Sequence, residues 1–185
     1  IDIINEDNNY DLAGLISNDY NISNEQFFQG YPILGNDDDL EKFVKYENAL
    51  VGIGQIKDPS PRINIYKKLK KIGFNLPIII SCHANVSKRV DIGEGSIVMK
   101  QALINADVKI GYNCIINNKA LIEHDVVISE NCHISTGAII NGNVTIGPNT
   151  FVGSGAILKN GISIPKNSII PAGSFINKDL ENIDV

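Results

Sequence analysis

The chain has 185 residues, of which 43% are hydrophobic, so it is long enough to bury a core in one large or two small domains. Its formal net charge of −5 argues against nucleic acid or an anionic membrane as partner, because a phosphate surface would repel it. No apolar stretch approaches the roughly 18 residues that span a bilayer and no signal peptide is visible, so we expect a cytoplasmic protein without a membrane partner.

Three apolar segments in the first 80 residues are predicted to be buried strands of a parallel sheet, at residues 11–17, 48–54 and 77–81. Two helices are expected between them. Asp37 or Asp38 caps the segment DLEKFVKYE, and Gly73 ends a basic helix with an apolar stripe of Ile63, Tyr66, Leu69 and Ile72. The opening residues IDIINEDNNYD resemble the end of a helix, which a strand and a glycine turn normally precede. Residues 1–80 are therefore predicted to form a small, N-terminally incomplete Rossmann-like α/β domain.

From residue 81 to residue 176 the sequence repeats every six residues, through sixteen uninterrupted hexads. The sixth place is always Ile, Val or Leu, and the fourth is nearly always small or β-branched, so the two places alternate like the inward face of a strand. A six-residue period excludes a helical solenoid. It predicts a parallel β-helix over residues 81–185, with three short strands in each coil of 18 residues.

The fifth place of each hexad should point outward and form one column of side chains on each face. Two columns are apolar and one is polar. The first is Ile97, Ile115, His133, Phe151 and Ile169, the second is Leu103, Leu121, Ile139, Ile157 and Phe175, and the polar third is Asp91, Lys109, Val127, Thr145 and Ser163. Because exposing two long apolar faces to water is unfavourable, we predict a homotrimer in which neighbouring copies cover them.

Two histidines are candidates for chemistry. His124 is expected at a corner between strands, where Glu123 and Asp125 can orient its ring and raise its basicity. Gly142 follows one coil later and brings an unshielded backbone N–H close to it. His133 interrupts an apolar column and is nine residues from His124, half of a coil, so the two rings should meet only between subunits.

The chain resembles a known family. The hexads, the IEHD motif at residues 122–125, the stretch HISTGAIINGNVTIGPNTFVGSGAIL from His133 and the upstream YPILGND and VGIG are similar to the sialic-acid O-acetyltransferase family, which includes bacterial amino-sugar N-acetyltransferases. The resemblance implies a left-handed β-helix and trimers. It also implies acetyl-CoA as co-substrate in the groove between adjacent β-helices, no metal, and a sugar or nucleotide-sugar acceptor held by the α/β domain for bacterial surface glycan synthesis.

The same resemblance implies roles for individual residues. His124 would be the general base of a direct transfer, with Glu123 or Asp125 polarising it, and Asn117 would touch the acceptor sugar. His133 would meet the thioester acetyl group, and Gly142 would stabilise the tetrahedral intermediate. Room for the pantetheine arm would come from Gly153, Gly155, Ala172 and Gly173. Contact with the nucleotide or sugar would come from Asn18, which replaces an acidic residue of the family, and from Asp19.

Two other functions fit a β-helix and stay open at this point. A γ-carbonic-anhydrase-like zinc enzyme takes two histidine ligands five residues apart from one subunit, a pair that His83, His124 and His133 do not form. The three cysteines form no CxxC pattern either. A non-catalytic β-helical scaffold would explain the hexads, but not the Glu-His-Asp sequence around His124.

Overall fold

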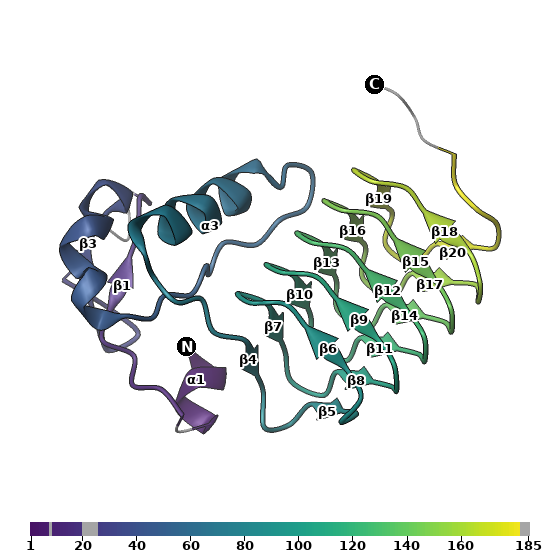
Figure 1. Ribbon diagram of the computed structural model, residues 1–185, viewed down its shortest axis with the longest axis horizontal. Coiled ribbons are helices and arrows are strands. Elements are labelled where there is room, and N and C mark those ends of the chain that lie inside the picture. Colours follow the sequence, from purple (N-terminus) through teal and green to yellow (C-terminus); the bar gives the residue numbers. More distant parts are fainter. Residues whose placement is uncertain (8, 20–25, 182–185) are drawn as a thin grey trace.

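The computed structural model describes residues 1–7, 9–19 and 26–181. A small α/β unit lies at the N-terminal end of a long prism built from regularly stacked coils (Figure 1). The prism is the expected left-handed parallel β-helix.

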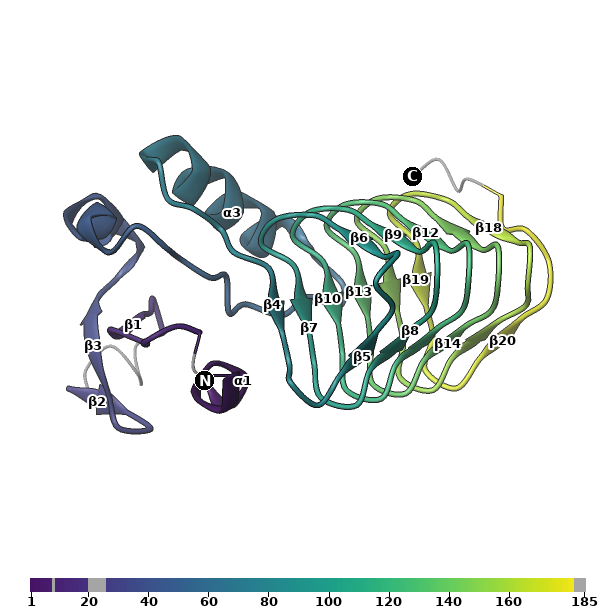
Figure 2. The same cartoon turned by 60° about the horizontal axis from the view of Figure 1, so that its bottom comes forward.

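Three parallel sheets form the faces of the prism, and Figure 2 shows them around its axis. The first face contains β4 (Ile79–Ile80), β7 (Ile97–Val98), β10 (Ile115–Ile116), β13 (His133–Ile134), β16 (Phe151–Val152) and β19 (Ile169–Ile170). The second contains β5 (Asn85–Val86), β8 (Leu103–Ile104), β11 (Leu121–Ile122), β14 (Ile139–Ile140), β17 (Ile157–Leu158) and β20 (Phe175–Ile176). The third contains β6 (Asp91–Ile92), β9 (Lys109–Ile110), β12 (Val127–Ile128), β15 (Thr145–Ile146) and β18 (Ser163–Ile164).

Each strand pairs with the strand one coil away, so that Ile115 lies beside His133 and Leu121 beside Ile139. This register stacks the fourth and sixth places into one continuous buried core, as the hexads predicted. Cys114 and Cys132 stack in that core as free thiols, and the N–H of Cys132 donates to the Sγ of Cys114 at 3.4 Å.

The corners between strands depend on the third place of the hexad, which has a positive φ in every coil from Gly95 onward. Gly, Asn and Asp occupy most of these places because they tolerate the left-handed conformation best. At the corner between the third and first faces, successive amides donate to one another along the prism. This asparagine ladder consists of Asn113, Asn131, Asn149 and Asn167.

The N-terminal unit contains α1 (Asp2–Asp7), β1 (Leu15–Ile16), β2 (Phe27–Phe28), β3 (Tyr31–Gly35), the 3₁₀ helix η1 (Asp37–Tyr46) and α3 (Ser60–Ile72). Its sheet has the order β1-β3-β2, with β1 parallel to β3. The prediction was right for β1 and missed β3. Residues 48–54 form only one bridge, between Asn48 and Asn75, and the strand predicted at residues 77–81 became β4 of the prism.

Two details of the predicted helices also differ. Asn36 rather than an aspartate caps η1, because its side chain accepts from the N–H of Asp38. Gly73 ends α3 in the left-handed conformation, as expected. The stripe of α3 that faces inward contains Arg62 with Tyr66 and Leu69, whereas Ile63 is only half-buried.

The two apolar columns of the prism are not equivalent. The α/β unit of the same chain covers the early coils of the first face, where Ile115 and His133 are each only 8% exposed. The second face has no such cover among the described residues, and Leu103 and Phe175 are exposed there. The expectation that neighbouring copies cover both apolar faces therefore needs correction for the early coils of the first face, which the same chain covers. Within the described residues, no helix is both long and apolar enough to cross a membrane.

We expect Asn131→Ala to lower the free energy of unfolding by about 2–3 kcal/mol, because it removes two ladder hydrogen bonds and a residue suited to a positive φ. Asn143→Ala is the matched control, since Asn143 has a φ of 60° at another corner but is exposed and outside the ladder. Urea unfolding measures both variants. Equal losses would show that the ladder contributes nothing beyond the corner conformation.

Candidate functional site

His124 lies at the corner between the second and third faces, immediately after β11. Its Nδ1 is 2.8 Å from Oδ2 of Asp125, and its side chain is 63% exposed. The hydrogen bond to Asp125 raises the pKa of His124, and the charges of Asp125 and Glu123 act in the same direction. A carboxylate on Nδ1 leaves Nε2 of the neutral ring as a proton acceptor.

Asp125 is the carboxylate that orients this ring. The other candidate, Glu123, accepts a hydrogen bond at 2.9 Å from Nδ2 of Asn105, one coil earlier. The choice that the sequence left open is therefore decided by geometry. Asp125 itself occupies the left-handed corner, with a φ of 60°, which directs its carboxylate back towards the preceding histidine.

Gly142 lies directly beneath the imidazole of His124. A Cβ at this position would come within 2.8 Å of Cε1 and 2.9 Å of Nε2, so any side chain would displace the ring. We expected an unshielded N–H at Gly142, whereas the residue is buried under the ring. Its N–H nevertheless has no hydrogen-bond acceptor among the described residues.

His133 lies in a different environment, on the first face beneath residues 51–55 of the α/β unit. Its Nδ1 is 2.7 Å from the carbonyl oxygen of Gln55, and its Nε2 is 3.1 Å from Nδ2 of Asn117. Burial lowers the pKa of His133, and the nearby charge of Arg62 lowers it further. The ring also contacts Phe151 edge-on, at a centroid distance of 5.2 Å.

A cavity of about 590 Å³ separates the α/β unit from the first face. His133 and Asn117 line it together with Lys100, Asn118, Gly52 and Gly54. The structure thus brings Asn117 and His133 together, a proximity that the sequence analysis did not predict. It does not bring His124 to them, because the corner between the second and third faces lies opposite the first face of the prism (Figure 2).

The four residues expected to leave room for a pantetheine arm divide into two groups. Gly155, Ala172 and Gly173 are exposed at the corner between the first and second faces, and nothing lies within 4 Å of a Cβ added at either glycine. Gly153 requires a different explanation. A Cβ there would come within 2.5 Å of the backbone nitrogen of Ala172, so this glycine is needed for the close approach of two coils.

Asn18 and Asp19, expected near a nucleotide or sugar, follow β1. The Asn18 amide is engaged with the start of η1, because its Oδ1 accepts from the N–H of Asp37 at 2.9 Å and its Nδ2 donates to the carboxylate of Asp37. The N–H of Asp19 donates to Oγ of Ser17 at 3.0 Å. Asn18 thus stabilises the local turn, and neither residue lines the cavity at His133.

Gln55 and Arg62 were not expected at the site. Gln55 supplies the carbonyl that meets His133, and its Nε2 donates to the carbonyl of Asn131 at 2.7 Å. Arg62 is completely buried on α3 and anchors the same segment. The signal that could have found Arg62 is its place beside the apolar stripe of a helix whose other basic residues face solvent.

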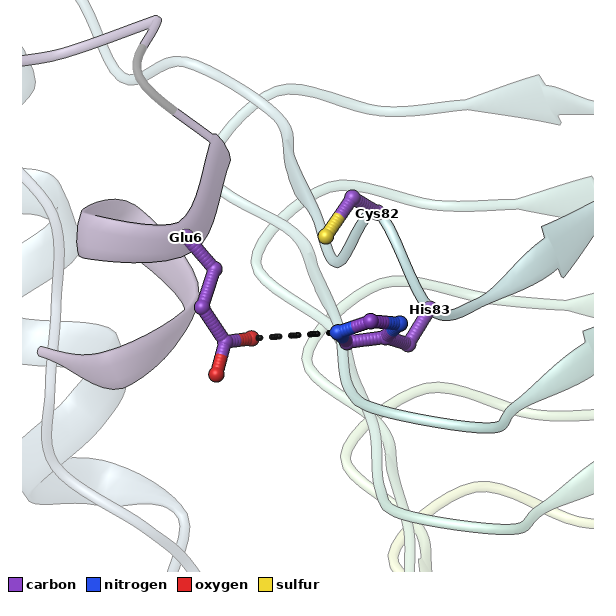
Figure 3. A group of neighbouring side chains, drawn as sticks. All are labelled: Glu6, Cys82 and His83. Atoms are coloured by element: carbon purple, nitrogen blue, oxygen red, sulfur yellow. Dashed lines mark ion pairs between the residues drawn. The ribbon is translucent and has the colours of Figure 1, made fainter.

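Three further potential metal ligands meet where α1 approaches the first coil. Glu6, Cys82 and His83 are exposed, and their ligand atoms all lie within 4.8 Å of one another (Figure 3). One oxygen of Glu6 forms an ion pair with Lys100 at 2.6 Å, and the other is 3.9 Å from Nε2 of His83. This group contains neither His124 nor His133, so it gives no support to a zinc site at those histidines.

Comparison with known proteins supports the resemblance seen in the sequence. The family described as bacterial transferase hexapeptide (six repeats) matches residues 125–160. A His-to-Asn variant of perosamine N-acetyltransferase from Caulobacter crescentus, solved with CoA and GDP-perosamine, is 32% identical over 84% of this chain and 74% of its own, with a TM-score of 0.80. The acetyltransferase domain of PglB from Neisseria gonorrhoeae, solved with acetyl coenzyme A, is 25% identical over 97% of this chain and 84% of its own, with a TM-score of 0.89. A search of curated proteins finds no match.

The assignment of Asp125 can be tested by NMR titration of His124. Replacing Asp125 by Asn should lower the pKa of His124 towards the ordinary imidazole value of about 6.5, because the bonded negative charge is lost. Glu123→Gln is the matched control and should lower it less, since Glu123 acts only through its charge. A larger effect of Glu123→Gln would assign the orienting role to Glu123.

Proposed function

Because the chain belongs to the hexapeptide-repeat sugar acetyltransferases, which use acetyl-CoA, we propose that it acetylates the amino group of a nucleotide-linked sugar. The observation that carries this proposal is the His124 and Asp125 pair above Gly142. It combines a proton acceptor, a carboxylate that orients it and an N–H with no acceptor among the described residues, all at one corner of the prism.

The reaction proposed here is a direct transfer without an acyl-enzyme. The amine nitrogen attacks the thioester carbonyl carbon, Nε2 of His124 takes the proton that the amine loses, and the carbon–sulfur bond breaks as the tetrahedral intermediate collapses. The thiolate of CoA leaves and accepts the proton held on Nε2 of His124, which returns the ring to its neutral form. Asp125 stabilises the imidazolium that forms, and the N–H of Gly142 is the proposed donor to the oxyanion.

The complete site is proposed to form between subunits of a homotrimer. His124 and the pair of Asn117 and His133 lie on opposite sides of one prism, so one chain alone cannot present them to the same substrate. The second face supplies an apolar surface for a neighbouring copy. A groove between two prisms would then bring the coenzyme past the open corner at Gly155, Ala172 and Gly173.

The nature of the relatives supports a nucleotide-linked amino sugar as the acceptor. Perosamine is an amino sugar, and the Caulobacter crescentus enzyme was solved with its GDP-linked form. O-acetylation of a sialic acid needs the same base and donor and is the second candidate, and either reaction would serve the synthesis of a bacterial surface glycan. Acetyl-CoA consumption with a panel of UDP- and GDP-linked amino sugars and free sialic acids distinguishes the two. Activity on sialic acids alone would contradict the proposal.

Replacing His124 by Ala should lower kcat by about 10²- to 10⁴-fold, the usual contribution of a general base, with little change in KM for acetyl-CoA. In the unchanged enzyme kcat/KM should fall as pH decreases through the pKa of His124, because the protonated ring cannot accept a proton. The raised pKa should move this acidic limb above the ordinary imidazole value. Near-normal kcat in His124→Ala would remove the base from the mechanism.

The trimer predicts a solution mass about three times the 20.2 kDa of the chain, as measured by light scattering. Leu121→Asp combined with Ile139→Asp should yield monomers without transferase activity, because charges would be buried on the second face. Val127→Asp is the control, since Val127 points outward from the third face and is 38% exposed. An active monomer would contradict the shared site.

A further inference from the structure

Both ring nitrogens of His133 are occupied within the chain. A carbonyl oxygen can only accept a hydrogen bond, so the contact of 2.7 Å to Gln55 requires the proton on Nδ1. Nε2 faces Nδ2 of Asn117, whose amide orientation is set because its Oδ1 accepts from the N–H of Asn118 at 2.7 Å. Nε2 is therefore the acceptor and Asn117 the donor. His133 is neutral in this arrangement and has no N–H left for a ligand.

Arg62 holds the segment that carries the Gln55 carbonyl. One of its terminal nitrogens donates to the carbonyls of Val51 at 2.6 Å and Ile53 at 2.8 Å. Its other nitrogens reach the carbonyls of Asn113 at 3.3 Å and Gly95 at 3.5 Å, on the first coils of the prism. Arg62 thus connects α3, residues 51–53 and the β-helix at one point.

The surroundings of Arg62 explain why it binds backbone carbonyls and not a carboxylate. The side chain is completely buried, and none of the ion pairs among the described residues includes it. A buried guanidinium loses its hydration, which costs free energy. Without a carboxylate partner, this cost is reduced only by well-placed hydrogen-bond acceptors. The four carbonyls are such acceptors, and the charge also disfavours a second cation on His133.

We propose that Arg62 and His133 are positioning residues that act through Asn117, an inference that rests on the proposed function. Arg62 fixes residues 51–55, the carbonyl of Gln55 fixes the tautomer of His133, and His133 takes one hydrogen of the Asn117 amide. The second hydrogen on Nδ2 of Asn117 is then available in the cavity for an oxygen of the acceptor sugar. This assigns the sugar contact to Asn117 and replaces the thioester contact expected for His133.

The tautomer can be tested on the unmodified protein. Imidazole ¹H–¹⁵N NMR at pH 8 should show His133 protonated at Nδ1 and unprotonated at Nε2. In Arg62→Lys, whose single ammonium cannot hold the carbonyls of Val51 and Ile53 in the same way, both tautomers should appear. Arg89→Lys is the matched control, because Arg89 is exposed and paired with Asp107. A proton on Nε2 in the unmodified protein would overturn the proposal, whatever reaction the enzyme catalyses.

The kinetic test is a double-mutant cycle. Asn117→Ala and His133→Phe should each raise KM for the acceptor sugar about tenfold, the value of one hydrogen bond, with little change in KM for acetyl-CoA. Because His133 acts through Asn117, the double variant should be no worse than Asn117→Ala alone. Additive losses, or a raised KM for acetyl-CoA in His133→Phe alone, would return a direct ligand contact to His133. A protein with the stated tautomer but without transferase activity would contradict the proposed function and leave the geometry intact.

Discussion

The structure depends on one constraint, which is that the strands of the β-helix pair with strands 18 residues away in the sequence. From Gly95 onward the chain turns between strands with a positive φ at every third place of the hexad, and this repeated corner keeps successive coils in register. The same register puts Gly142 under His124 and Phe151 beside His133. Site geometry is therefore a consequence of coil stacking, and a one-residue slip would dismantle both at once.

This constraint places two histidines in opposite electrostatic conditions. His124 is exposed beside a carboxylate, which raises its pKa and prepares the ring to accept a proton. His133 is buried beside a guanidinium, which lowers its pKa and keeps the ring neutral. The residue type is the same, and these two environments suit His124 to the proposed proton transfer and His133 to fixed hydrogen bonding.

The β-helix could be predicted almost completely from the sequence, because each hexad contains one short strand and its fourth and sixth places mark the side chains that point into the core. The first 80 residues could not, since their strands are short and their partners are distant. Residues 48–54 have the composition of a strand, yet the carbonyls of Val51 and Ile53 are bound by Arg62 instead of by a neighbouring strand. The contact between Gln55 and His133 joins residues 78 positions apart in the sequence, and no local sequence pattern predicts it. The sequence allowed either Glu123 or Asp125 to orient His124. The hydrogen bond from Asn105 to Glu123, one coil away, explains why Asp125 takes this role.

The unequal cover of the two apolar faces connects the fold to the proposed reaction. The α/β unit covers Ile115 and His133, and the cavity beside Asn117, where the proposed reaction holds its acceptor, lies on this first face. The second face is uncovered among the described residues and is the proposed docking surface for a neighbouring copy. The corner with His124 borders this second face. A copy that docks there can bring its own cavity to the base of its neighbour. The proposed division of the prism into an acceptor face, a subunit face and a solvent face therefore follows from the fifth place of the hexads. One column is apolar and covered by the α/β unit, one is apolar and uncovered among the described residues, and one is polar.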